Sequence, residues 1–230
     1  MYGDTHVAPA ILCEITTEPP PPDAIEIYFA APMSLSLLAD LFCSDEGLAH
    51  MDRELAEIVL HATNKAVTVV QQVGGYVIDA DLGRSVPARL ELAARVENDV
   101  PGQSVARLHT HLYVGRTATS LEGGRRWPVD LAELRDAADM AWSTWKRLLV
   151  SETTSVFGYR WAPLPGHHPA DVELVEPPLH EHVHLHARVF CPGLDTSGHE
   201  RIVADEQSRR ITRQMGYAVD AGELPEAAAG

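Results

Sequence analysis

The chain has 230 residues, of which 45% are hydrophobic, and a formal net charge of −15 from 33 acidic and 18 basic residues. This length and composition predict one folded domain with at most a small appendage, and the acidic balance argues against strong nonspecific binding of nucleic acid, which requires lysine and arginine. The three cysteines are widely spaced, which argues against a disulfide framework. We also see no apolar run long enough to span a membrane and no secretory signal, so we expect a cytoplasmic protein.

The first half of the chain predicts an irregular start, a strand and two helices. Residues 1–24 end in four consecutive prolines, which cannot donate backbone hydrogen bonds, so we expect an irregular, proline-rich segment. Residues 25–29 alternate as a strand does. A short helix is expected to begin at Ser34 or Ser36, and residues 46–72 carry apolar side chains at three- and four-residue steps, which predicts an amphipathic helix.

The second half predicts short strands and another helix. Residues 76–78 and 88–96 are typical of strands, separated by an Asp-Leu-Gly turn, and a further strand runs through residues 108–114. Residues 130–148 gather apolar and tryptophan side chains on one side of a helix, which indicates a helix facing the core. Because strands and helices occur in mixed order with hairpin-like strand pairs, we predict an α+β fold, a central antiparallel sheet with helices packed on it.

The strand at residues 108–114 contains the most informative pattern, two histidines separated by one residue. Side chains of an extended strand alternate between its faces, so His109 and His111 point the same way, and Arg107 shares their face. Two neighbouring imidazoles are half of a divalent-metal site. The alternative is a solvated strand face whose histidines bind nothing.

A second group of histidines lies in residues 179–186. In a strand, His180, His182, His184 and His186 would line one face and could hold a metal. In a helix started by the two preceding prolines, His182 and His186 would instead pair at positions i and i+4. The apolar residues between the histidines favour the strand. The alternative is a solvated, pH-sensitive face without a ligand.

Three separated segments resemble one protein family. Residues 26–38 read Glu-Ile-Tyr-Phe-Ala-Ala-Pro-Met-Ser-Leu-Ser-Leu-Leu, similar to a motif in which an acidic residue precedes TFSAPKSVSLL. Residues 106–111, Ala-Arg-Leu-His-Thr-His, resemble the metal motif PQLHTH, and residues 124–131 resemble the turn DGKWRALD. Over residues 24–165 the chain is therefore similar to the TrwC-type (MobF) conjugative relaxases, HUH endonucleases that nick one DNA strand at a transfer origin.

The resemblance implies a relaxase (HUH)-like fold and metal-assisted transesterification by a tyrosine, which leaves a 5′-phosphotyrosine. Because a free tyrosine with a pKa near 10 is a weak nucleophile, Glu26 would act as its base. A weakly bound divalent ion (Mg, Mn or Zn), held by His109 and His111, would polarise the scissile phosphate. Tyr28 and Tyr113 lie near the motif residues, but their pattern places both in the sheet.

The chain departs from the family at three places. The third metal histidine of the family lies eleven residues before the first histidine of the pair, where this chain has Asn98. An amide oxygen is a poorer ligand than an imidazole, so the site should bind metal more weakly or recruit a further group. Glu97 and Asp99 are nearby candidates for that group. The nucleophilic tyrosines of the family lie well before the acidic motif residue, and here only Tyr2 precedes Glu26, separated from it by far fewer residues than in the family. The resemblance therefore leaves Tyr2 as the nucleophile; the alternative is an ordinary residue of the chain terminus. Met33 replaces the motif lysine, which removes a positive charge.

These matches and departures predict a relaxase-like protein of conjugative transfer or plasmid mobilisation, either active or degenerate. Its implied partners are single-stranded DNA at a transfer or replication origin and relaxosome proteins, with no membrane. The predicted DNA contacts are Arg107, Ser34 and Ser36. One alternative is a non-catalytic DNA- or protein-binding domain that keeps the fold, and a second is a metal-binding protein that uses the histidines of residues 180–186.

We expect four parts along the chain. The irregular segment of residues 1–24 precedes a relaxase-like domain at residues 25–165. A histidine-rich C-terminal extension, residues 166–217, is expected to pack on the same domain. Residues 218–230 are small and acidic, which predicts a flexible tail.

Overall fold

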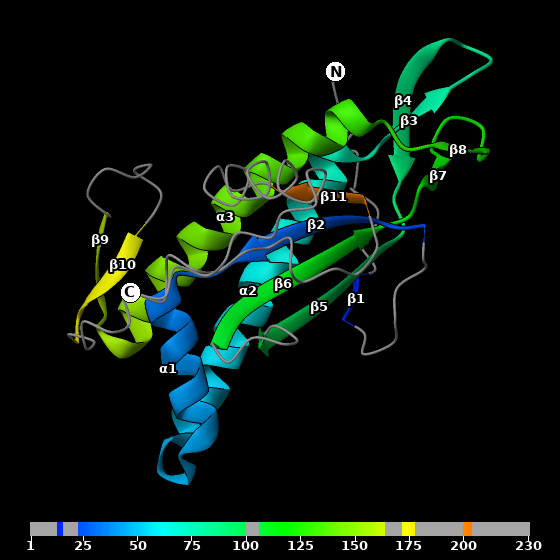
Figure 1. Ribbon diagram of the computed structural model, residues 1–230. Coiled ribbons are helices and arrows are strands. Elements are labelled where there is room, and N and C mark those ends of the chain that lie inside the picture. Colours follow the sequence, from blue (N-terminus) through cyan, green and yellow to red (C-terminus); the bar gives the residue numbers. More distant parts are fainter. Residues whose placement is uncertain (1–12, 16–22, 100–105, 164–171, 178–199, 204–230) are drawn as a thin grey trace, which may run out of the picture.

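The computed structural model describes residues 13–15, 23–99, 106–163, 172–177 and 200–203 (Figure 1). Its elements in chain order are β1 (Cys13–Ile15), β2 (Ile25–Ala30), α1 (Met33–Ser44), the 3-10 helix η1 (Glu46–Leu48), α2 (Ala49–Gly74), β3 (Tyr76–Asp79), β4 (Arg84–Arg89), β5 (Leu92–Asp99), β6 (Ala106–Val114), β7 (Thr117–Ser120), β8 (Arg126–Pro128), α3 (Leu131–Phe157), β9 (Arg160–Pro163), β10 (Val172–Glu176) and β11 (Glu200–Val203).

Five strands form one sheet in the order β1-β5-β6-β2-β11. Its three central strands, β5, β6 and β2, are antiparallel neighbours, while β1 and β11 run parallel to β5 and β2 at the two edges. The long helices α2 and α3 lie across one face of this sheet (Figure 1). The predicted α+β fold, an antiparallel sheet with helices packed on it, is confirmed.

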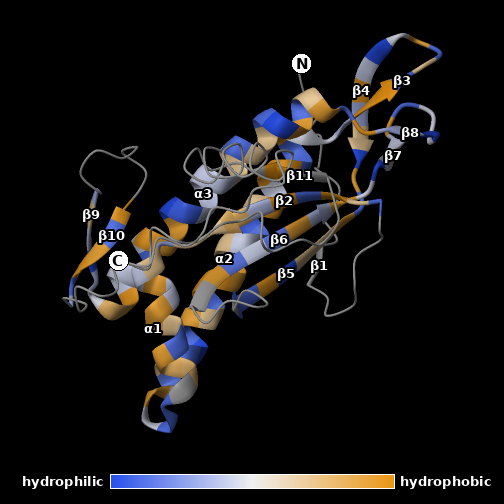
Figure 2. Cartoon of the chain, viewed as in Figure 1, coloured by the Kyte–Doolittle hydropathy of each residue, from blue (hydrophilic) through white to orange (hydrophobic). Residues whose placement is uncertain are grey.

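The face of the sheet that meets α2 and α3 carries the hydrophobic core. In β2 the side chains of Ile27 and Phe29 are completely buried, and the Phe29 ring stacks on Trp145 of α3 with ring centroids 5.9 Å apart. The Trp145 indole donates a hydrogen bond to the hydroxyl of Thr63 on α2 (3.2 Å). Figure 2 shows apolar and polar residues alternating along both helices, as amphipathic helices require. These contacts hold the two helices against the central strands.

Helix α3 is longer than predicted. It begins after Asp130, whose carboxylate accepts hydrogen bonds from the N–H groups of Ala132 and Glu133 (3.0 and 3.5 Å). It ends only at Gly158, which adopts the left-handed conformation with φ of 71°. Residues 131–157 contain neither glycine nor proline, so no local signal ends the helix at residue 148.

The strand expected at residues 88–96 is two strands in two different sheets. β4 ends at Arg89 and belongs to a four-stranded sheet of order β3-β4-β7-β8, whereas β5 begins at Leu92 in the five-stranded sheet. Between them, the Leu90 N–H donates a hydrogen bond to Oε1 of Gln71 on α2 (2.9 Å). Both strands have the same two-residue period, so alternation alone does not reveal the change of sheet.

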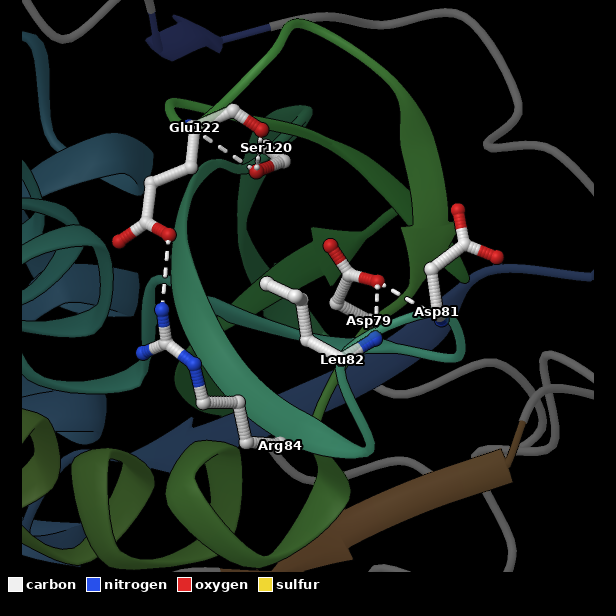
Figure 3. A network of polar contacts seen from close by, with 6 residues as sticks. All are labelled: Asp79, Asp81, Leu82, Arg84, Ser120 and Glu122. Carbon is white, nitrogen blue, oxygen red and sulfur yellow. Dashed lines mark hydrogen bonds and ion pairs between the residues drawn. The ribbon is translucent and has the colours of Figure 1, made fainter.

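The turn between β3 and β4 is held by Asp79. Its Oδ1 accepts hydrogen bonds from the N–H groups of Asp81 and Leu82 (2.9 and 3.1 Å; Figure 3). Figure 3 also shows the ion pair of Arg84 with Glu122 (3.0 Å), which joins β4 to the segment after β7. Both side chains of this pair are about half exposed, so the pair adds little to stability.

Two described strands belong to the predicted C-terminal extension. β10 pairs with β9, and β11 pairs with the central strand β2. The predicted boundaries at residues 166 and 218 lie outside the described residues, and the four-part division remains a prediction. Among the helices of the described residues, none has the length and apolar character needed to cross a membrane.

Candidate metal centre

The two histidines of β6 lie on the face of the sheet opposite to α2 and α3. In the antiparallel register, His111 stands across from Tyr28 of β2, and His109 stands between Ala30 of β2 and Glu97 of β5. Directly paired residues of antiparallel strands point to the same face. The register therefore gathers side chains from three strands around the histidine pair.

A carboxylate completes the set of possible metal ligands. Oε2 of Glu97 lies 3.6 Å from Nε2 of His109 and 3.6 Å from Nε2 of His111, and the ligand atoms of the three residues all lie within 4.8 Å of one another. A tetrahedral zinc site with metal–ligand distances near 2.0–2.1 Å separates its ligand atoms by about 3.3 Å. These donor atoms are therefore close to the spacing that a single divalent ion needs.

The second nitrogen of His111 is bound by another carboxylate. Oε1 of Glu26 on β2 lies 2.5 Å from Nδ1 of His111, and the Glu26 side chain is completely buried. An Nδ1–H donated to a carboxylate leaves Nε2 as the lone-pair nitrogen, and such outer partners orient most metal-binding histidines. The structure thus places Glu26 where it orients His111, while its predicted role as the base for a tyrosine stays untested.

Neighbouring side chains lower the pKa of Glu97, which favours its carboxylate form. The contact with His109 is the largest cause of a lowered Glu97 pKa, partial burial opposes it, and electrostatic interaction with His111 and Arg95 adds to the lowering. Arg95 of the same strand also forms an ion pair with Glu97. An ionised carboxylate beside two imidazoles is a suitable donor set for a divalent cation.

Two tyrosines form part of the wall around the imidazoles. The Tyr28 ring lies 5.3 Å from the His109 ring and 5.6 Å from the His111 ring, centroid to centroid, and Tyr113 stacks on His111 at 5.9 Å with an interplanar angle of 2°. Both are buried sheet residues, as the sequence pattern indicates. Their rings limit how far the imidazoles can rotate.

Asn98, the predicted third ligand, lies on the other face of the sheet. It lines a cavity together with Val96 and Leu108, because consecutive side chains of a strand alternate between faces. Glu97, which pairs with His109 in the register, takes the place beside the histidines. The structure therefore does not bring Asn98 to the histidine pair, whereas Glu97, one of the two carboxylates considered as an additional ligand, lies beside it.

Ser34 and Ser36, predicted to contact DNA, have structural partners instead. The Ser34 hydroxyl donates to Glu173 of β10 and accepts the N–H of Leu174 (3.0 Å). The Ser36 hydroxyl accepts the N–H of Leu108 on β6 (2.9 Å). Both serines are completely buried, so they are not available to a DNA strand in this conformation.

Glu173 also binds the backbone at the start of α1. Its carboxylate accepts the N–H groups of Met33 and Ser34 (3.1 and 2.9 Å) at the first turn of α1, where the preceding Pro32 provides no side-chain cap. A distant strand thereby satisfies the free N–H groups of the helix. Met33, at the position of the motif lysine, is buried in the protein.

The remaining predicted site residues lie outside the described part of the structure. They are Tyr2, the side chain of Arg107, the side chain of Asp99, and His180, His182, His184 and His186. Their predicted roles as nucleophile, DNA contact, additional ligand and second metal site therefore stay predictions.

Among known proteins, similarity to this chain was found only by comparing three-dimensional structures. No family model matches the chain, and no curated protein matches it. A structure of conjugative relaxase TrwC with mutant oriT DNA is similar over 88% of this chain and 60% of that one, with 14% identity and a TM-score of 0.46. The metal-bound TrwC complex with oriT DNA has 17% identity over 88% and 58% of the chains, and the copper-bound complex 13% over 86% and 70%, both with a TM-score of 0.46.

This chain thus spans about 60% of the first of these structures. Sequence identities of 13–17% do not establish membership of the relaxase family. The functional hypothesis therefore rests on the residues of the metal centre and on the sequence motifs.

Proposed function

We propose that this chain is a relaxase-like protein that binds a divalent metal ion through Glu97, His109 and His111 and acts with it on a phosphodiester of single-stranded DNA. The observation that carries the proposal is the meeting of two imidazole nitrogens and one carboxylate oxygen from separate strands. The buried Glu26 that binds His111 supports it further, because orienting a histidine in this way is characteristic of metal sites.

The donor atoms favour particular ions. Imidazole nitrogens suit Mn²⁺ and Zn²⁺, whereas Mg²⁺ prefers sites made of oxygen atoms. With two nitrogens and one carboxylate oxygen, this centre should bind Zn²⁺ more tightly than Mn²⁺, and both more tightly than Mg²⁺. We therefore propose Mn²⁺ or Zn²⁺ as the resident ion.

The proposed reaction is a transesterification. The oxygen of a tyrosine hydroxyl bonds to the phosphorus as the bond to O3′ breaks. The tyrosine proton passes to the departing O3′, so the products are a free 3′-hydroxyl and a 5′-phosphotyrosine. A divalent ion held beside the phosphate would offset the charge that develops on its oxygens. Glu26 would hold the His111 imidazole in position, Glu97 would bind the ion with the histidines, and Tyr2, which precedes Glu26, would be the nucleophile.

A labelling experiment tests the reaction. Random-sequence single-stranded oligonucleotides with a fluorophore at the 3′ end are incubated with the protein and Mn²⁺ or Mg²⁺. Because the protein would become attached to the 5′ end of the 3′ fragment, a covalent product carries the label through denaturing electrophoresis. We expect this product from the wild type and its loss in Tyr2→Phe and in His109→Ala. Absence of both adduct and DNA binding at every concentration tested would sink the DNA proposal.

One observation favours a second candidate function, a non-catalytic domain that binds DNA or a protein and uses the metal for stability. The side chains of His109 and Glu26 are completely buried, that of His111 is 3% exposed and that of Glu97 is 14% exposed, so the histidines offer almost no surface to a phosphodiester in this conformation. Under this alternative, metal raises the melting temperature and His109→Ala removes that rise, but no covalent adduct forms with any oligonucleotide.

A further inference from the structure

We infer that a groove on the opposite face of the sheet from the metal centre binds a small, apolar molecule that donates one hydrogen bond. The groove has a volume of about 270 Å³ and lies between α1, α2 and the ends of β5 and β6. It has no part in the proposed DNA chemistry, so the two proposals can fail independently.

The walls of the groove are apolar. Its lining includes Leu55 and Val59 of α2, Val96 of β5 and Leu108 of β6. Aliphatic walls of this kind favour a ligand whose own surface is apolar, because burial removes that surface from water. An engineered cavity of about 150 Å³ with similar walls already holds benzene. The volume here is therefore sufficient for a fused two-ring molecule.

One polar group inside the groove has no hydrogen-bond partner. Oδ1 of Asn98 is buried, and no donor in the described part of the chain contacts it. Leaving a buried acceptor unsatisfied costs free energy, so buried acceptors normally have a partner. A ligand with an N–H or O–H group provides that donor, and this sets the chemical class of the occupant.

A thiol lies at the rim of the groove. Cys43 of α1, which is exposed, donates a hydrogen bond to Oδ1 of Asp52 on α2 (3.1 Å), and both residues line the groove. This bond, together with burial and the charge of Asp52, raises the pKa of Cys43 to about 11. The thiol is neutral at physiological pH and leaves the entrance without a thiolate charge, while remaining available as a reporter.

Indole and benzofuran test the inference because they have nearly the same shape, but only indole has an N–H. We expect isothermal titration calorimetry to show that the wild type binds indole about five-fold more tightly than benzofuran, the ratio that one net hydrogen bond provides. The Asn98→Leu variant should bind both with equal affinity. Absence of indole binding at millimolar concentration, equal affinities in the wild type, or a preference that persists in Asn98→Leu would each overturn the inference.

A second pair of variants locates the binding site. Ala56 is an exposed α2 residue that lines the groove, whereas the exposed Glu54 on the same helix does not. Ala56→Phe should abolish binding of both probes, and the matched control Glu54→Phe should retain it. Independently of any variant, saturating indole should slow alkylation of Cys43 by iodoacetamide at pH 9, measured on the peptide that contains it. Unchanged binding in Ala56→Phe or an unchanged alkylation rate would place the ligand elsewhere and refute the groove.

Discussion

Replacing Glu26 by glutamine tests whether this residue orients a metal-binding histidine. The change keeps the shape of the side chain but converts the charged hydrogen bond to Nδ1 of His111 (2.5 Å) into a neutral one. Charged hydrogen bonds contribute about 1.5–3 kcal/mol and neutral ones about 0.5–1.5 kcal/mol. The difference, about 1–1.5 kcal/mol, corresponds to a roughly ten-fold loss of metal affinity, at the lower end of the 10–100-fold range typical of such partners.

The assay is a titration of metal-free protein with Mn²⁺ in competition with a fluorescent chelator. Because histidines at 180–186 could bind additional metal, the full chain with these four histidines changed to glutamine serves as the background for every variant. Glu57→Gln, at an exposed position of α2, is the control and should leave the affinity unchanged.

Two outcomes would refute the reasoning. If Glu26→Gln binds Mn²⁺ as tightly as the background protein but forms no DNA adduct, Glu26 acts as the base that the family resemblance implies and not as the partner of His111. If neither metal affinity nor adduct formation changes, the Glu26–His111 contact has no functional role.

Further predictions concern ligation and stability. Glu97→Gln should lower Mn²⁺ affinity more than Glu26→Gln, by more than about ten-fold, in the same titration. Glu173→Ala removes the carboxylate at the start of α1 and should cost about 2–4 kcal/mol in urea unfolding, whereas a loss below 0.5 kcal/mol, roughly that of an ordinary surface change, would contradict its role. Gly158→Ala, at φ of 71°, should cost about 1–2 kcal/mol. Hydrogen bonds, chiefly from Ser85, lower the Asp130 pKa. The ionised carboxylate therefore stabilises the fold fully at pH values above its unfolded pKa near 3.9, and this stabilisation is lost as the pH falls through the lower folded pKa. The stability difference between the wild type and Asp130→Asn should shrink over that window, and a pH-independent difference would contradict this.

The candidate site shows where prediction from local sequence stops. The shared face of His109 and His111 follows from the two-residue period of a strand, which holds whatever the strand pairs with. The third ligand depends on how β5 aligns with β6, a pairing of segments separated along the chain. Counting back eleven residues from the pair led to Asn98, whereas the register and the alternation of faces place Glu97 beside the histidines.

Burial also separates the prediction from the structure at Ser34 and Ser36. Ser34 and Ser36 were predicted to contact DNA because they lie in the motif that resembles the relaxase family. Their hydroxyls are used by β10 and β6 instead. Glu173 lies 139 residues after Ser34 in the sequence. A partner so far along the chain leaves no signal in the local pattern of residues.

The α+β class, the long amphipathic helices and the shared face of the histidine pair could all be predicted from the amino-acid pattern, because each depends on periodicity within one segment. The packed fold was needed to show that Glu97 lies beside the pair, that Glu26 contacts Nδ1 of His111 and that both histidines are buried. These features arise from strand register and from contacts between distant segments, which a local pattern of residues does not encode.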